Sequence, residues 1–186
     1  MGKWIIVGVL VILALIVWAN YNGLVGAGNA VDRAWSDVEA AYQRRLDTIP
    51  KFAKTAQFSA DFQIKLQDKY VQGREGVKTA AATGDPVALQ KAANDAFEAM
   101  MISVRVEAVP QAKTEQLTEL NAQVENVERV INHERKAFNE AVMNNNNKVQ
   151  MFPGNIFAAT FGFRARQSFQ AEEGANKSPD FNLNIK

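Results

Sequence analysis

The stretch that decides the fold is KWIIVGVLVILALIVWANYNGLVGAGNAVDRAW, residues 3–35. It contains no proline, and no charged residue lies between Lys3 and Asp32. Residues 4–19 are sixteen positions without a polar side chain, slightly fewer than the roughly 20 that a spanning helix needs. Trp4 and Trp18 lie near the two ends, where aromatic rings prefer the level of the lipid headgroups. We therefore expect a membrane anchor over residues 1–22 that continues into a helix of the following domain.

A cleaved secretory signal is the alternative interpretation of the same stretch, because it too has a basic residue before an apolar core. The small-residue site ending at Ala30 lies more than ten residues beyond that core and has an asparagine between its small residues. This favours a retained anchor. Lys3 on a very short tail favours a cytoplasmic N-terminus, so we expect the remainder of this single-pass chain on the extracytoplasmic side.

Apolar residues at helical spacing continue through the rest of the chain, and no stretch shows sustained strand alternation. The first stripe runs from Val31 to Ile49, where Pro50 is expected to kink or restart the helix. A second stripe runs from Phe58 to Ala80 or Ala81. It is followed by TGDP, in which Gly84 suits a helix C-terminus, Asp85 a cap and Pro86 the first position of the next helix.

A third helix from Pro86 is expected to end before Pro110. The fourth is the most regular, with Leu117, Val124 and Ile131 spaced by seven as in a coiled-coil seam. These patterns predict an all-α fold in which the transmembrane helix continues into an antiparallel four-helix bundle of long helices over residues 23–169.

The end of the chain is less regular. Asn144 to Asn147 are interpreted as a helix end, and residues 156–163 form an uncharged segment with three phenylalanines. This segment either caps its own bundle or contacts a neighbouring subunit or lipid. Residues 170–186 are rich in polar residues and are expected to be a flexible tail.

Charge and cysteine content exclude several classes of function. The formal net charge is +1, and no basic block appears along the sequence, so we expect no nucleic-acid partner and no electrostatic footprint for anionic lipid. The absence of cysteine excludes disulfides, thiolate catalysis and thiolate metal sites, and suits an oxidising compartment.

The search for catalytic and metal-binding residues is mostly negative. His133 is the only histidine, and Val130 and Ala137 stand where a di-iron or zinc-protease helix would need a glutamate or a second histidine. Glu125 and Glu128 have the spacing of exposed intrahelical ion pairs. We therefore predict no enzymatic activity, and no catalytic, cofactor-binding or metal-binding residues.

Several strings together resemble the LemA family of bacterial membrane-anchored proteins. They are YNGLV from Tyr21, NAVDRAWSDVE from Asn29, RRLDTIP from Arg44, LNAQVENVERVINHERKAFNEAV from Leu120 and MFPGNIFA from Met151. The resemblance implies a single-pass anchor in the bacterial inner membrane, followed by an antiparallel bundle without established enzymatic activity. Phe138 stands where the family usually has a tyrosine, so no hydroxyl-dependent role is implied there.

The resemblance also directs attention to Arg44, Arg45 and Asp47, which precede Pro50. Charges at such a place can pair across helices and stabilise the local geometry. We expect a non-enzymatic scaffold, anchored in the lipid bilayer, that forms homo-oligomers or binds other membrane or envelope proteins. An oligomeric protein that shapes or organises the membrane is the alternative. A metal enzyme using Glu125, Glu128 and His133 ranks last.

Overall fold

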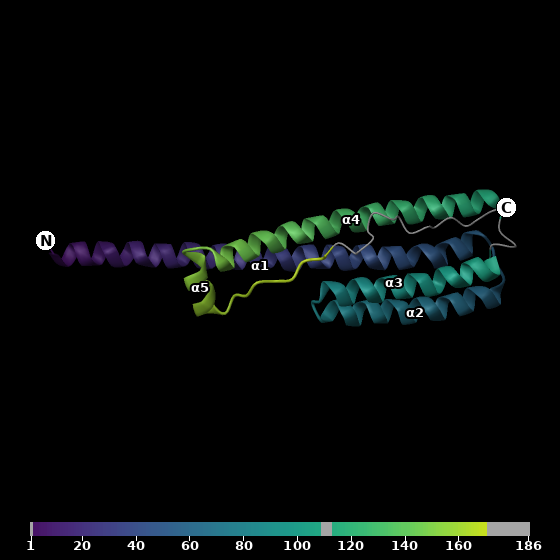
Figure 1. Cartoon of the computed structure of the whole chain (residues 1–186), viewed down its shortest axis with the longest axis horizontal. Coiled ribbons are helices and arrows are strands. Elements are labelled where there is room, and N and C mark those ends of the chain that lie inside the picture. The colour runs from purple at the N-terminus through teal and green to yellow at the C-terminus, as the bar shows by residue number, and fades with distance from the viewer. Residues whose placement is uncertain (1, 109–112, 171–186) are drawn as a thin grey trace. The chain divides into compact units, whose positions relative to one another are not determined.

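The computed structural model describes residues 2–108 and 113–170, and within these ranges all regular structure is helical (Figure 1). The expected all-α fold is confirmed. The position of Pro110 and residues 171–186 of the predicted flexible tail lie outside the described residues. The elements are α1 (Gly2–Thr55), α2 (Ala60–Ala82), α3 (Pro86–Ser103), the π-helical turn η1 (Val104–Ala108), α4 (Thr114–Gln150) and α5 (Gly154–Phe161).

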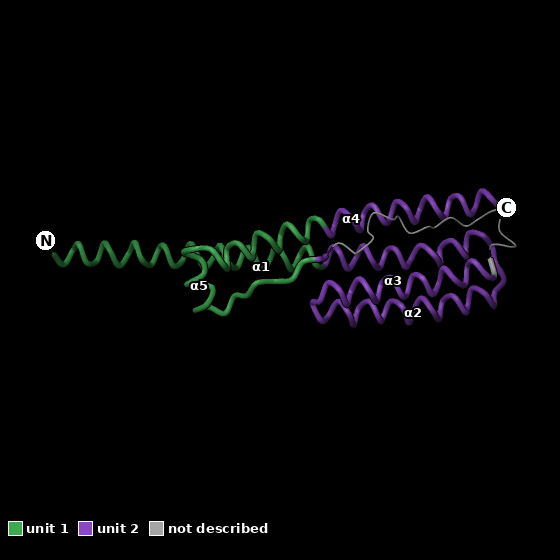
Figure 2. Tube along the Cα trace, viewed as in Figure 1, with its two compact units in different colours: residues 1–35, 136–168 green, residues 36–135, 169–186 purple. Residues whose placement is uncertain are grey.

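The chain divides into two compact units, and helices α1 and α4 each contribute to both (Figure 2). Unit 1 consists of residues 1–35 and 136–168, and unit 2 of residues 36–135 and 169–186. Unit 1 combines parts of α1 and α4 with the short α5, whereas unit 2 contains parts of α1 and α4 with α2 and α3. A single four-helix bundle over residues 23–169 is therefore not confirmed.

Helices α2 and α3 of unit 2 form a hairpin whose turn has the predicted chemistry. Gly84 has a positive φ of 68°, which favours glycine, and the Asp85 side chain accepts a hydrogen bond of 2.8 Å from the backbone N–H of Val87. Pro86 occupies the first turn of α3, where its missing N–H has no helical acceptor to lose. The TGDP motif thus reverses the chain between two antiparallel helices.

The core of unit 2 is formed by the apolar stripes expected from the sequence. In α3 the predicted residues Leu89, Ala93, Phe97, Met100 and Val104, the last at the helix C-terminus, are all buried. In α4 the heptad residues Leu117, Leu120, Val124 and Ile131 are buried as well. The regular seam of α4 is therefore used inside the protomer.

Of the two outcomes expected at Pro50, a kink or a restart, the restart does not occur, and the helix end expected at Asn144–Asn147 lies slightly farther along the chain. Helix α1 continues through Pro50 to Thr55, because its last turns bury Phe52 and Ala53, and the Phe52 ring lies 5.6 Å from that of Phe58. This packing offsets the backbone hydrogen bond that proline cannot donate. Helix α4 continues through Asn144–Asn147 to Gln150, and the side chains of Asn145 and Asn146 have partners outside their own helix.

Two glycines of α2 test how closely α2 and α3 approach. A Cβ atom added at Gly73 would lie 2.8 Å from Cβ of Ala96, whereas one added at Gly76 would meet nothing within 4 Å. We expect Gly73→Ala to lower the free energy of unfolding by about 1–2 kcal/mol, because overpacking outweighs the gain in helix propensity. Gly76→Ala should raise it by about 0.5–1 kcal/mol. The two free energies of unfolding are measured by denaturant titration of the full-length variants in detergent, with circular dichroism as the signal. Equal stability of the two variants would contradict the close approach.

Candidate functional site

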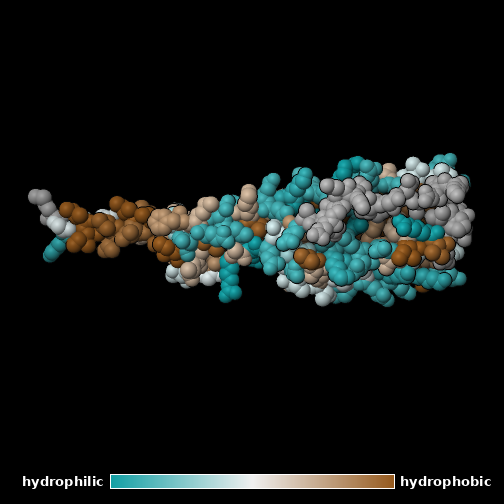
Figure 3. All heavy atoms as spheres, viewed as in Figure 1, coloured by the Kyte–Doolittle hydropathy of each residue, from teal (hydrophilic) through white to brown (hydrophobic). Residues whose placement is uncertain are grey.

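The N-terminal part of α1 is an apolar helix that no other part of unit 1 covers. Its large side chains from Trp4 to Trp18 are exposed and form one continuous hydrophobic surface (Figure 3). Among the described residues, α1 is the one helix that is long and apolar enough to cross a membrane. A signal sequence near an N-terminus meets the same test of length and composition.

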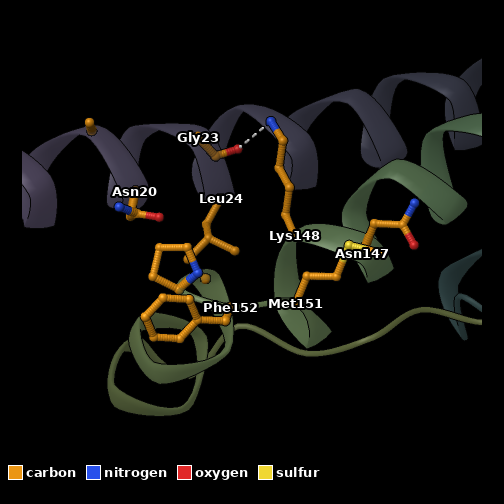
Figure 4. A pocket seen from close by; sticks show the side chains of 10 residues that line it. Asn20, Gly23, Leu24, Asn147, Lys148, Met151 and Phe152 are labelled. Carbon is orange, nitrogen blue, oxygen red and sulfur yellow. Dashed lines mark hydrogen bonds between the residues drawn. The ribbon is translucent and has the colours of Figure 1, made fainter.

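A groove lies where this apolar run ends, and we call it the exit groove. It encloses about 370 Å³ between α1, the end of α4 and the start of α5. Its lining residues are Ala19, Asn20, Gly23, Leu24, Asn147, Lys148, Met151, Phe152, Pro153 and Gly154. Lys148 extends across the groove, and its ammonium donates a hydrogen bond of 3.2 Å to the carbonyl oxygen of Gly23 (Figure 4). The groove is thus mainly apolar with one cation at its edge.

Two local features hold α5 at this groove, one against α4 and one against α1. Gly154, the first residue of α5, lies against the carbonyl oxygen of Lys148 so closely that a Cβ atom has no space. The ring of Tyr21 on α1 packs edge-on against Phe161 and Phe163, with centroid distances of 5.1 and 5.9 Å. The glycine of the MFPGN string is therefore required by a close backbone approach.

The asparagine run anchors the segment that follows α5. Asn145 is buried and donates to the carbonyl of Arg164 at 3.2 Å. The Asn146 amide donates to the carbonyl of Arg166 at 2.9 Å and accepts from its N–H at 2.8 Å. Sequence reasoning missed this role, because the partner backbone lies about 20 residues away and no local pattern points to it.

Helix α5 is only partly a cap. Gly154 and Ala158 are buried, whereas Ile156 and Phe161 are exposed and Phe157 is half-buried. Met151 and Phe152, just before the helix, are exposed too. The segment 156–163 therefore packs on unit 1 through one face and presents an apolar face outward.

In unit 2 the predicted charge pairing before Pro50 is found for Arg45. Its side chain is buried, with 6 % of the residue exposed, and Nη1 donates to Oδ1 of Asn94 at 2.7 Å. Its Nε lies 2.8 Å from Oε1 of Glu128, a charge contact without the alignment of a hydrogen bond. The guanidinium also lies 4.1 Å from the centroid of the Phe97 ring. One side chain of α1 thereby joins α3 and α4.

Asp47 pairs with α2, while Arg44 is exposed. The Tyr70 hydroxyl donates to Oδ1 of Asp47 at 2.7 Å and accepts from Nη1 of Arg74 at 2.7 Å. Arg74 also donates to Oε1 of Gln43 at 3.2 Å. Burial and the hydrogen bond to Asp47 raise the pKa of Tyr70, and the hydrogen bond to Tyr70 raises the pKa of Arg74. The hydroxyl therefore stays protonated at neutral pH.

A shallow cavity of about 430 Å³ lies beside Tyr70 and Arg74. Its other lining residues are Glu39, Gln43, Val71, Glu75 and Lys78. Tyr70 and Arg74 are already hydrogen-bonded to each other, which is typical of a structural network between α1 and α2.

The residues considered for metal chemistry do not converge. Glu125 pairs with Arg129 at 3.6 Å within α4, Glu128 contacts Arg45, and His133 is exposed. Within residues 2–108 and 113–170, no three histidine or acidic side chains are grouped so that they could hold a metal ion. Glu128 has a packing role that its i,i+3 spacing from Glu125 did not predict.

The LemA family model matches residues 34–182, which is most of the chain. The chain therefore belongs to the LemA family, as the strings at Asn29, Arg44, Leu120 and Met151 indicated. No curated protein and no solved structure matches the chain.

The two glutamates of α4 provide a matched test of the Arg45 cluster. Glu128→Gln removes the carboxylate beside a buried guanidinium and should lower the free energy of unfolding by about 2 kcal/mol. Glu125→Gln affects an exposed pair and should change it by less than about 0.5 kcal/mol. Chemical denaturation of both full-length variants measures the difference; similar values would show that the Arg45 contact contributes little.

Tyr70→Phe tests the second network. Loss of the hydroxyl should lower the free energy of unfolding by about 1 kcal/mol at pH 7. Because the folded-state pKa of Tyr70 is raised above 10.0, the contribution of the hydroxyl is fully present below that pH and is lost as the pH rises through the folded-state pKa. The stability difference between wild type and Tyr70→Phe should therefore be constant from pH 7 to about 9 and shrink above pH 10. A difference that grows above pH 10 would reverse the assigned sign.

Proposed function

We propose that this LemA-family protein is a non-enzymatic helical scaffold, anchored by a single span in the bacterial inner membrane, that self-associates or binds other envelope proteins. The observation that carries the proposal is the uncovered apolar run from Trp4 to Trp18, which belongs to the same helix that builds both units. Apolar side chains on this scale are favourable only where lipid or protein surrounds them.

Support for a scaffold over an enzyme comes from how the charged residues are used. The Arg45 contacts join α1, α3 and α4, and the Tyr70 contacts join α1 and α2. Each of these groups is engaged in packing between helices of one unit. A raised pKa at Tyr70 also opposes a role as a nucleophile, which would need a lowered one.

The surface for self-association lies outside the seam of α4, because Leu117, Val124 and Ile131 are already buried within the protomer. On α2, Ile64 and Val71 are 60 % and 56 % exposed and lie seven residues apart, which places them on one helix face. We infer that a second copy of the chain covers this pair.

Light scattering of detergent-solubilised full-length protein tests this proposal at micromolar concentration. The protein mass, after subtraction of detergent, should exceed that of one 20.5 kDa protomer. A double Ile64→Lys and Val71→Lys variant should shift toward the monomer, whereas Val87→Lys on α3, at a residue exposed by 60 %, should not. A monomeric wild type that also crosslinks to no membrane protein would eliminate the scaffold.

A second candidate function is an oligomeric protein that organises or shapes the membrane. It is favoured by the outward apolar face of α5, which belongs to the same unit as the apolar run. Amphipathic elements that lie in the headgroup region can bind and deform a bilayer.

The proposed side of the membrane for both units is extracytoplasmic. Lys3 before the span and the absence of cysteine support this placement. Reporters fused to the C-terminus, one active only in the cytoplasm and one only outside it, distinguish the two orientations.

A further inference from the structure

The apolar run of α1 is shorter than the membrane it is proposed to cross. Sixteen helical residues extend about 24 Å, whereas the hydrocarbon core is about 30 Å thick. The next turn begins with Asn20, whose side-chain amide donates to the carbonyl of Ile16 at 2.8 Å within the helix. This internal bond lowers the cost of placing the amide in the apolar or interfacial layer. The turn that completes the span is thus the one that lines the exit groove.

Apolar surface from α5 continues the band at the same level of unit 1. Tyr21 contacts Phe161, and Ala19 and Phe152 line the same groove. Phe152 is 80 % exposed and Ile156 is 56 % exposed. If α1 crosses the bilayer, this face of α5 lies where the helix leaves the hydrocarbon layer, so lipid is the occupant that the geometry selects.

The charge of unit 1 favours anionic lipid over neutral lipid. From Asn20 onward this unit has five basic and two acidic residues, a net charge of three positive, although the whole chain is only +1. The basic residues are Arg33, Lys136, Lys148, Arg164 and Arg166, and the acidic ones are Asp32 and Glu140. Arg166 is paired with Asp32 at 3.5 Å, and Lys148 is the basic residue that lines the exit groove. A basic residue close to a membrane surface attracts anionic headgroups. This excess of positive charge is not evident from the sequence, because residues 20–35 and 136–168 are far apart along the chain.

Lys148 is the basic residue whose position allows it to bind a lipid headgroup. Its ammonium lies at the edge of the groove and is bonded to the Gly23 carbonyl, an oxygen within a helix. Exchanging that acceptor for a phosphate oxygen would replace a neutral partner by a charged one, which gives a stronger hydrogen bond. Met151 and Phe152, both exposed, offer apolar contact beside it. The volume of about 370 Å³ accommodates part of a lipid, near the lower end of the usual range for ligand sites.

We propose that the exit groove binds an anionic phospholipid of the surrounding bilayer, with its phosphate on Lys148 and the start of an acyl chain against Met151 and Phe152, while the outer face of α5 rests in the headgroup layer. The inference rests on the proposed membrane anchor, but not on self-association.

The depth of α5 is tested with full-length protein in liposomes of phosphatidylglycerol and phosphatidylcholine. The chain has no cysteine, so Ile156→Cys and Val87→Cys each give a single site for a nitroxide label, and these residues are similarly exposed. The ratio of collisions with membrane-dissolved oxygen to collisions with a water-soluble nickel chelate should be clearly higher for the Ile156→Cys label than for the Val87→Cys label. Flotation of the liposomes first reports whether the protein is inserted.

These readouts separate the two proposals. Protein that does not float with the liposomes contradicts the membrane anchor itself. Protein that floats, but whose Ile156→Cys label is as accessible to the nickel chelate as the Val87→Cys label, overturns the placement of α5. Dipolar broadening between Ile156→Cys labels on neighbouring copies, without oxygen contact, would show that a second copy covers this face and would also overturn it.

Headgroup preference is tested by native mass spectrometry of full-length protein released from mixed-lipid nanodiscs. Wild type should retain phosphatidylglycerol over phosphatidylcholine, and Lys148→Gln should reduce that preference about fivefold. Lys136→Gln removes a charge from the same unit outside the groove and should reduce it less. Phe152→Ser should lower retention of both lipids. Circular dichroism confirms that each variant remains helical. Equal effects of Lys148→Gln and Lys136→Gln, or equal retention of both headgroups, would overturn the site.

Discussion

The structure depends on the continuity of α1 from Gly2 to Thr55, because this one backbone contains both the apolar run and the buried stripe that other helices pack against. At the N-terminal part every large side chain is uncovered, while residues such as Val38, Leu46 and Ile49 farther along are fully buried. A helix can combine the two because its backbone hydrogen bonds are satisfied internally whatever surrounds the side chains. Pro50 does not end it, since burial of the following turn outweighs one missing bond.

The buried polar groups of unit 2 favour one particular alignment of its helices. Arg45 is surrounded by an amide, a carboxylate and an aromatic ring from two other helices, so only one alignment of these helices satisfies it. Apolar stripes alone tolerate a shift of one helix along another far better than such a set of contacts does. We infer that the charges near Pro50 determine the register of the helices, which deletion of one partner would loosen.

Unit 1 is held together differently. A close approach between backbones and the hydrogen bonds of side-chain amides position the apolar helix α5. Gly154 permits close contact with α4, and Asn145 and Asn146 hold the extended segment after α5. The result is an apolar face and a cation beside the place where the apolar run ends. This arrangement is the physical basis for the proposed contact of unit 1 with lipid.

The sequence by itself determined the all-α class, the hairpin turn at Gly84–Pro86 and most buried stripes, because these depend on local periodicity and capping. It also indicated that Arg45 and Asp47 pair across helices. The continuation of helices through Pro50 and through Asn144–Asn147 was decided by tertiary contacts, whose energy exceeds local propensity. The division into two units, the partners of Arg45, the role of the asparagines and the positive charge of unit 1 depend on residues far apart in the chain, and only the folded structure brings such residues together.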